Sequence, residues 1–220
     1  RPRAGTRRGL IRFREDAHTS QSCFAMVLPV YAYGHDSLRE ETEPVDENSE
    51  ALQTLIDHMI ETMYAASGIG LAAPQVGRRE RLFVVDVTPM AAELREAGEA
   101  VPPQPMVFIN PDIVWESEGE TDFEEGCLSI PDVREVVRRP ASIRIRYRDR
   151  DFNEQKRDVG NMLARVIQHE YDHLDGVLFT DYLSSFRKRL LRRTLRNIAE
   201  GNVSADYPLV TRENEHVPAE

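Results

Sequence analysis

The sequence has few of the features that mark secreted or membrane-embedded proteins. It contains only two cysteines, Cys23 and Cys127, which is too few for a disulfide framework. A reducing compartment is therefore the simpler interpretation. No apolar run approaches the roughly 20 residues that cross a bilayer, and no secretory apolar segment precedes the expected domain. We accordingly expect no membrane partner.

The sequence also lacks an excess of positive charge. Its formal net charge is −10 at pH 7, which argues against a protein that binds DNA with its whole surface. A local basic patch remains compatible with this total. The 220 residues are 40% hydrophobic and 30% charged, and they are numerous enough for a full core and few enough for one domain.

Composition divides the chain into three regions. Residues 1–25 contain six arginines before the first acidic residue, Glu15, and have few apolar residues. We predict that they form a disordered leader, or an extension upstream of a natural start at Met26. An organellar transit peptide is the alternative, although the amphipathic pattern is poor. Residues 26–200 are predicted to form a single domain, and residues 201–220 a polar, flexible tail.

Hydrophobic periodicity predicts an α+β fold. Apolar residues recur at helical spacing in 49–66 and again in 184–200, whose stripe is Phe186, Leu190, Leu191, Leu195 and Ile198. Strands are expected at 81–87 and 141–151, with 106–118 extended but broken at Pro111. The strands have short spacing, which favours antiparallel or mixed sheets. We expect them to pack around a central helix, with one further helix near each end of the domain.

That central helix is predicted over 160–176, GNMLARVIQHEYDHLDG. Asn161 is suited to cap its start and Gly176 to form the left-handed turn at its end. His169 and His173 are four residues apart, so both imidazoles project from one face and can bind one divalent metal. Glu170, beside the first histidine, is placed to handle a proton of water rather than to bind the metal.

Two histidines do not complete a catalytic metal site, which usually has three protein ligands. The acidic residues and histidine downstream do not belong to a recognisable ligand motif; they are Asp175, Asp181, Glu200 and His216. Upstream, Cys127 lies in the segment EEGCLS. The residues alone leave two interpretations open, a third metal ligand or a buried structural cysteine.

Three stretches together resemble the signature motifs of the peptide deformylase family. They are GIGLAAPQVG at 68–77, EEGCLSIP at 124–131 and QHEYDHLDG at 168–176, and they occur in the family's order and spacing. The resemblance extends from Met26 to about Ala199. It implies that Cys127, His169 and His173 bind one divalent metal. In the family this metal is usually Fe²⁺, and Ni²⁺, Co²⁺ or Zn²⁺ can occupy the same ligands.

The resemblance also implies the reaction, which is hydrolysis of the formyl group from N-formyl-methionyl nascent peptides in the bacterial cytoplasm. Glu170 would act as the base, while the side-chain amide of Gln75 and the backbone N–H of Leu128 would stabilise the oxyanion. The peptide would pair with the protein backbone as an added strand. The expected substrate-binding residues are Gly68, Ile69, Gly70, Glu125, Gly126, Met162 and Val166.

Several charged and polar residues around these motifs have two interpretations. Arg134 or Arg139 could pair with Glu125, and Gln168 or Asp172 could orient the ligands from behind. The six basic residues of 184–200 are either a solvated helix face or a docking surface for ribosomal RNA near the nascent-chain exit.

Two rival functions use the same residues differently. A zinc endopeptidase would share the HExxH pattern, take its third ligand from downstream and leave Cys127 dispensable. A metal-free binding module would keep the fold and use only its basic helix. The presence of both Glu170 and Gln75 argues against the second rival, which has no evident need for either residue.

Overall fold

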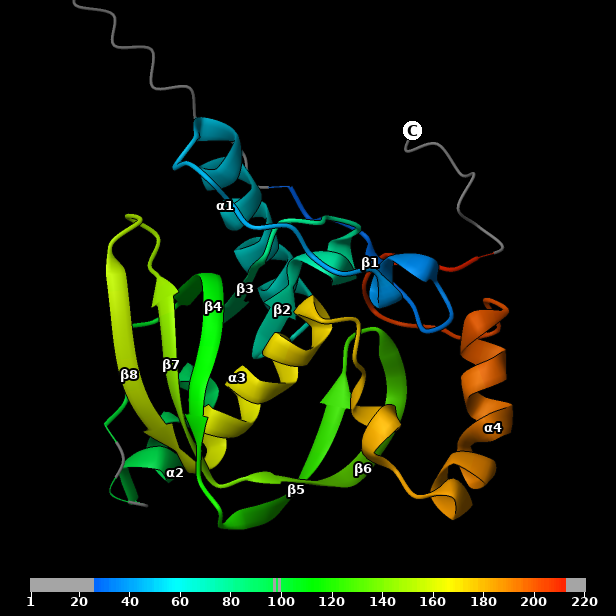
Figure 1. The fold of residues 1–220 in the computed structure, drawn as a ribbon. Helices are drawn as coiled ribbons and strands as arrows, with labels where there is room; N and C mark the ends of the chain where they lie inside the picture. The colour runs from blue at the N-terminus through cyan, green and yellow to red at the C-terminus, as the bar shows by residue number, and fades with distance from the viewer. Residues whose placement is uncertain (1–25, 97, 99, 213–220) are drawn as a thin grey trace, which may run out of the picture.

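The computed structural model describes residues 26–96, 98 and 100–212 (Figure 1). The predicted leader, with Cys23, and the last eight residues of the predicted tail lie outside this part of the chain. The α-helices are α1 (Glu50–Ala65), α2 (Ala91–Glu96), α3 (Asn161–Leu174) and α4 (Ser185–Ala199). The 3-10 helices are η1 (Asp36–Arg39), η2 (Ala73–Val76), η3 (Thr88–Met90) and η4 (Phe179–Tyr182). The strands are β1 (Val30–Tyr31), β2 (Gly70–Ala72), β3 (Leu82–Val85), β4 (Met106–Glu116), β5 (Glu120–Cys127), β6 (Ile130–Pro140), β7 (Ser142–Arg148), β8 (Glu154–Gly160) and β9 (Leu209–Val210).

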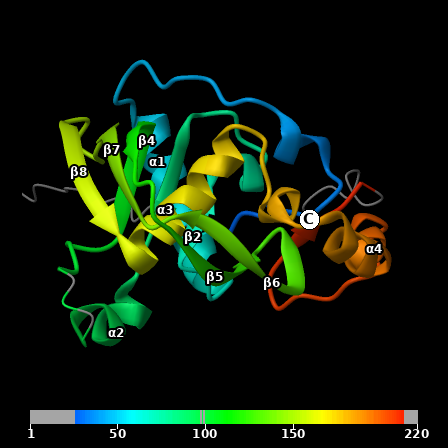
Figure 2. The ribbon, with the colours of Figure 1, turned by 60° about the horizontal axis from the view of Figure 1, so that its bottom comes forward.

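The strands form one large sheet and two pairs. The large sheet is antiparallel throughout, in the order β2-β3-β4-β7-β8. Strands β5 and β6 form an antiparallel hairpin, and β1 pairs in parallel with β9. Figures 1 and 2 show the hairpin between the large sheet and α4, which lies on the opposite side of the molecule from β8. The predicted α+β class with antiparallel and mixed pairing is confirmed.

Helices cover both faces of the large sheet, and β3 shows why. Phe83 and Val85 of this strand belong to the cluster around α3, whereas Leu82 and Val84 belong to the cluster around α1. Successive side chains of a strand point to opposite faces. A strand that is buried on both faces therefore consists of an uninterrupted apolar run, as LFVV does.

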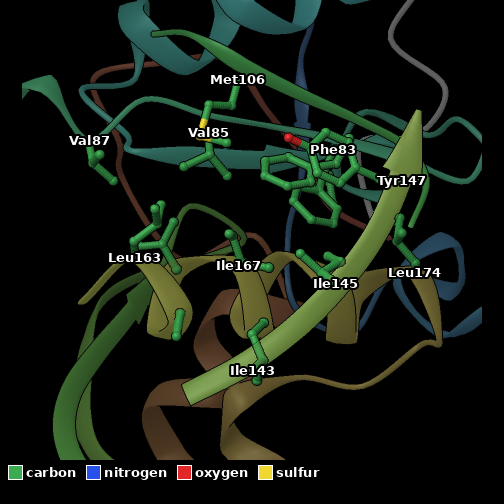
Figure 3. Packing of buried hydrophobic residues seen from close by; sticks show 14 of the residues in the cluster. Phe83, Val85, Val87, Met106, Ile143, Ile145, Tyr147, Leu163, Ile167 and Leu174 are labelled. Atoms are coloured by element: carbon green, nitrogen blue, oxygen red, sulfur yellow. The ribbon is translucent and has the colours of Figure 1, made fainter. Parts of the chain in front are cut away.

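The packing of α3 against the sheet fixes the position of this helix. Figure 3 shows Leu163 and Ile167 pointing from α3 toward the strands that carry Phe83, Val85 and Tyr147. Ile167 is fully buried, and burial of such a side chain contributes about 1.5–3 kcal/mol. The polar side chains of α3 are thus carried on an element with little freedom to move.

A third hydrophobic cluster joins the β5–β6 hairpin to the end of the domain. It includes Ile130 and Val137 of β6, Phe179 of η4, and Leu195 and Ile198 of α4. The side chain of Cys127 packs against this cluster while remaining partly exposed. The end of β5 is therefore supported by α4 and η4, and α3 is supported by the large sheet.

The start of α3 differs from the prediction. Gly160 occupies the N-cap position without a side-chain hydrogen bond, and Asn161 is inside the helix with a φ of 46°. A tertiary contact accompanies this conformation, in which the N–H of Asn161 donates to the carbonyl of Ala141 at 2.9 Å. Gly176 does adopt the left-handed conformation expected after the helix, with a φ of 69°.

Pro111 does not break β4, which continues to Glu116. Instead the pairing with β7 shifts register between Ile109 and Asp112, and Asn110 has a φ of 49°. An irregularity of this kind accommodates a proline, which lacks the N–H that a regular ladder needs.

The C-terminal region differs from the prediction in two respects. In α4, Leu195 and Ile198 are buried, but Phe186 and Leu190 of the expected apolar stripe are 66% and 58% exposed. Residues 201–212 are not a free tail, since β9 pairs with β1 and Thr211 is buried. Among the described residues, no helix has both the length and the apolar character that spanning a bilayer requires.

Candidate metal centre

The predicted metal ligands converge from two elements. Helix α3 presents His169 and His173 with ring centroids 5.1 Å apart, and β5 ends at Cys127. One ligating atom from each of the three side chains lies within 4.8 Å of the others, and Cys127 Sγ is 3.3 Å from His173 Nε2. The β5–β6 register shifts between Gly126 and Cys127, so the cysteine lies at a bulge near the end of the ladder.

The two imidazoles have complementary surroundings. His169 Nδ1 lies 2.9 Å from Glu125 Oε2, and because a carboxylate can only accept, this nitrogen carries the proton and leaves Nε2 for a cation. Burial, the largest cause, lowers the pKa of His173 well below its ordinary value. A neutral imidazole is the form that binds a metal.

Glu125 connects His169 to two buried arginines. Arg139 donates to both of its carboxylate oxygens, at 2.7 and 3.0 Å, and Arg165 donates to Oε1 at 2.8 Å. Although burial raises the pKa of Glu125, the hydrogen bonds from His169 and Arg139 hold it well below its ordinary value. Glu125 therefore remains an anion that orients His169, and both of its oxygens are engaged within the protein.

The contacts of Glu125 show which arginine pairs with it and include a second arginine that was not expected. Of the two arginines considered from the sequence, Arg139 pairs with Glu125. Arg165 was not expected, because nothing in the periodicity of α3 distinguishes a buried arginine from an exposed one. It is 3% exposed and also donates to the carbonyl of Val137 at 2.8 Å, which ties α3 to β6.

Asp172 supports the same network from the next turn of α3. It accepts from Arg139 at 2.6 Å and from the hydroxyl of Tyr182 at 3.1 Å. Gln168 instead donates to the carbonyls of Pro140 and Ala164. Asp172 is thus connected to His169 by hydrogen bonds through Arg139 and Glu125. Gln168 instead connects α3 to the end of β6.

Glu170 lies between the candidate ligands and β2. It is 5% exposed, and its Oε2 has no hydrogen-bond partner among the described residues. Burial, the largest cause, raises the pKa of Glu170 to about 7. A β-carbon at Gly70 would collide with the Glu170 carboxylate, so only glycine leaves room for this side chain.

Gln75 directs its amide toward the same centre from η2. The N–H of Ala72 donates to Gln75 Oε1 at 2.8 Å, which fixes the orientation of the side chain. Gln75 Nε2 lies 3.4 Å from Cys127 Sγ and 3.3 Å from Ser129 Oγ. A hydrogen-bond donor is therefore held beside the cysteine.

The expected substrate-binding residues occupy three places. Gly68 and Ile69 lead into β2, which is an edge strand of the large sheet. Gly126 is in β5, and a β-carbon on Gly68 would come within 2.8 Å of Leu128 Cδ1, so these two segments are close. Val166 is buried in the cluster around α3, and Met162 packs partly buried against it.

The donor set fits a divalent transition-metal ion. One sulfur and two imidazole nitrogens suit several such ions, and three protein ligands leave a position for a further group. Glu170 follows His169 in the chain, and its Oε2 accepts no hydrogen bond from a described residue. The centre therefore has an acceptor for the proton of a further group.

Comparisons with known proteins agree with this geometry. A family model described as polypeptide deformylase matches residues 27–189. The peptide deformylase of Salinibacter ruber is 71% identical over 194 residues, which cover 88% of this chain and 100% of that protein. The enzyme of Christiangramia forsetii is 46% identical and covers 84% and 95%. The crystal structure of peptide deformylase from Ehrlichia chaffeensis matches with a TM-score of 0.72 at 34% identity, covering 80% of this chain and 98% of that one.

Proposed function

Because this chain belongs to the polypeptide deformylase family, whose members depend on a metal and remove the N-formyl group from nascent peptides, we propose specific roles for its residues in that reaction. Cys127, His169 and His173 hold the metal, and Glu170 is the catalytic base. The observation that carries this proposal is the meeting of the three ligating atoms within 4.8 Å, beside a buried carboxylate oxygen that no described residue occupies.

A divalent cation held by these three residues would supply Lewis acidity for the activation of water and the polarisation of the formyl carbonyl. Glu170 accepts a proton from the attacking water at its carboxylate and returns it to the departing amine, so that formate and a free amino terminus are released. Gln75 Nε2 and the backbone N–H of Leu128 donate to the developing oxyanion. Removal of one such donor commonly costs about 3 kcal/mol of barrier.

The resident ion in this proposal is Fe²⁺, and Ni²⁺, Co²⁺ or Zn²⁺ can replace it, because imidazole and thiolate ligands suit all four. Cys127 contributes negative charge to the ion, which makes it a milder Lewis acid than one held by neutral ligands alone. The formyl carbon is unhindered and electrophilic, so a milder centre suffices for this bond and not for ordinary amides.

The substrate peptide adds as a strand beside β2. Support comes from the position of β2 at the sheet edge, with Gly68 close to the loop that carries Leu128. Backbone pairing through 68–70 and Gly126 recognises length and direction more than side chains. Ile69, Met162 and Val166 form the wall that faces the first side chain. Glu125 supports this wall from within, since its oxygens are occupied.

The catalytic domain of this proposal spans residues 26–200, is completed by the paired segment 201–212, and works in the bacterial cytoplasm, where nascent chains emerge. Helix α4 docks the enzyme on the ribosome. All six basic residues of α4 are exposed, and Phe186 and Leu190 are exposed among them, which gives the helix a charged face with an apolar component.

The test of the catalytic role replaces Glu170 with glutamine, which keeps the shape of the side chain and removes the base. Incubated with N-formyl-methionyl peptide under oxygen-free conditions, Glu170→Gln should release formate at least about a hundredfold more slowly than the parent protein. Its metal content, measured by mass spectrometry, should be unchanged because Glu170 is not a ligand.

The matched control is Glu124→Gln, an exposed carboxylate of β5, which should keep full activity. Undiminished formate release by Glu170→Gln would contradict the proposal. Unchanged metal content in Cys127→Ser would favour the endopeptidase alternative, in which the cysteine is dispensable.

A further inference from the structure

The turn between β5 and β6 is anchored by two residues that lie far from it in the sequence. The hydroxyl of Tyr207 donates to the carbonyl of Leu128 at 2.8 Å, and the N–H of Tyr33 donates to the carbonyl of Ser129 at 2.7 Å. Cys127 and Ile130 face each other across this turn. Two successive carbonyls are thereby held directly beside a candidate metal ligand.

The segments that carry Tyr33 and Tyr207 are paired with each other. Strand β9, two residues after Tyr207, pairs with β1, two residues before Tyr33. Two further hydrogen bonds join the segments, from the N–H of Val30 to the carbonyl of Pro208 and from the N–H of Ala32 to the carbonyl of Val210, both 2.8 Å long. The hydroxyl of Tyr207 is therefore delivered by backbone that is itself paired, and not by a loose chain end.

Tyr207 remains a hydrogen-bond donor throughout the neutral range. Burial, followed by the negative charges of Cys127 and Asp132, raises the pKa of Tyr207 to about 12. The protonated phenol can donate to a carbonyl, whereas a phenolate could only accept.

The geometry limits the motion of Leu128 on three sides. Its carbonyl is held by Tyr207, the next carbonyl by Tyr33, and its side chain packs against Gly68 and the cluster around α1. The N–H and the carbonyl of Leu128 lie in successive peptide planes joined at its Cα, so the φ and ψ angles of Leu128 couple the direction of the N–H to that of the fixed carbonyl. A donor that stabilises a transition state must already point correctly before the reaction.

We infer that Tyr207 is a positioning residue, which holds the Leu128 N–H in the direction that the oxyanion requires by fixing the Leu128 carbonyl. This inference rests on the proposed role of Leu128 as an oxyanion donor. Tyr207 lies outside the match to the family model, which ends at residue 189, and in the segment that sequence patterning assigns to a flexible tail.

The test is Tyr207→Phe in the full chain, which removes one hydroxyl and keeps the ring. We expect kcat to fall about tenfold while KM changes by less than about twofold, because the lost restraint matters only when the oxyanion forms. In the zinc-loaded protein, the Leu128 amide should exchange with solvent several-fold faster by NMR.

The matched control is Tyr147→Phe in β7, which removes a hydroxyl that Arg157 contacts at 2.8 Å in the large sheet. The unfolding temperature of this control should lie within a few degrees of that of Tyr207→Phe. Its kcat and the exchange rate of its Leu128 amide should equal those of the parent protein. Unchanged exchange in Tyr207→Phe, or faster exchange with unchanged kcat, would overturn the inference. The exchange readout needs no turnover. A parent protein without formate release would therefore refute the proposed function while leaving the contact measurable.

Discussion

At the scale of single residues, the site depends on which side chains are absent as well as on which are present. Gly70 is required because its missing β-carbon is the space that the Glu170 carboxylate occupies. Glu170 in turn is buried and has an oxygen without a partner among the described residues, which is costly unless function maintains it. The glycine and the carboxylate are therefore one feature, although they are a hundred positions apart in the chain.

Gly70→Ala should displace Glu170 and lower kcat for formate release by about a hundredfold, since a shift of about 1 Å in a catalytic group can cost that much. The unfolding temperature should fall by only a few degrees, because β2 keeps its backbone pairing to β3. Calorimetry and a formate assay measure the two effects.

Gly119→Ala is the comparison, because a β-carbon there meets no atom within 4 Å. That variant should retain the activity of the parent protein. Equal activity of the two variants would show that the crowding at Gly70 does not govern the position of Glu170.

At the scale of elements, α4 has one side buried against the domain and the others exposed. Leu195 and Ile198 anchor it to the third hydrophobic cluster, which also supports β6. Its other faces are exposed and basic, and Arg187 pairs with Glu135 while Lys188 donates to the carbonyl of Asp181. The remaining arginines have no ion-pair partner among the described residues, so they are available to phosphate groups.

Replacing Arg189, Arg192 and Arg193 by alanine should weaken co-sedimentation with ribosomes and reduce its salt dependence, because each lost phosphate contact removes released counterions. The affinity should be measured by pelleting at several salt concentrations. Hydrolysis of free formyl peptides should be unchanged, since α4 provides none of the proposed reacting groups.

A control of equal charge replaces Arg144, Arg146 and Arg148 in β7, which pair with Asp158, Asp112 and Glu154 respectively. Replacement of these three arginines should not affect ribosome binding. Identical losses in the two triple variants would mean that net charge, and not α4, determines the association.

At the scale of the whole molecule, the candidate metal centre joins parts that have separate cores. His169 and His173 stand on α3, which packs on the large sheet, while Cys127 packs against the cluster that contains α4. A cation bound by all three residues links these two parts. A ligand that binds only the folded state raises the free energy of unfolding. The increase grows with the logarithm of the ratio of the ligand concentration to its dissociation constant.

Removing the metal with a chelator should therefore lower the unfolding temperature of the whole domain, and adding Zn²⁺ or Ni²⁺ should restore it. A ligand in hundredfold excess over its dissociation constant contributes about 2.7 kcal/mol. Differential scanning calorimetry measures this change. In Cys127→Ser the chelator should have a much smaller effect, and an equal effect in both proteins would contradict three-ligand binding.

The helices and the buried strands were predictable because their periodicity is visible locally. The helices around Leu55 and His169 have clear apolar stripes, and LFVV is recognisable as a buried strand. Strand β8, EQKRDVG, was not predicted because its side chains are mostly charged and it is defined by pairing with β7.

Long-range polar contacts were the other part that sequence could not supply. Arg165 reaches Glu125 across 40 positions, and Tyr207 reaches Leu128 across 79. Neither contact leaves a local pattern, because the same residue types on a helix or near a chain end are usually solvated. The resemblance of three short motifs, and not periodicity, connected Cys127 with the two histidines.

The parallel pairing of β1 with β9 has a consequence for synthesis of the protein itself. Val30 leaves the ribosome early, and Leu209 leaves it after every residue proposed to bind metal or substrate. A prematurely terminated chain could thus contain the complete set of chelating side chains and still lack the closing strand. The fold of the enzyme would then be complete only after Leu209 has been synthesised.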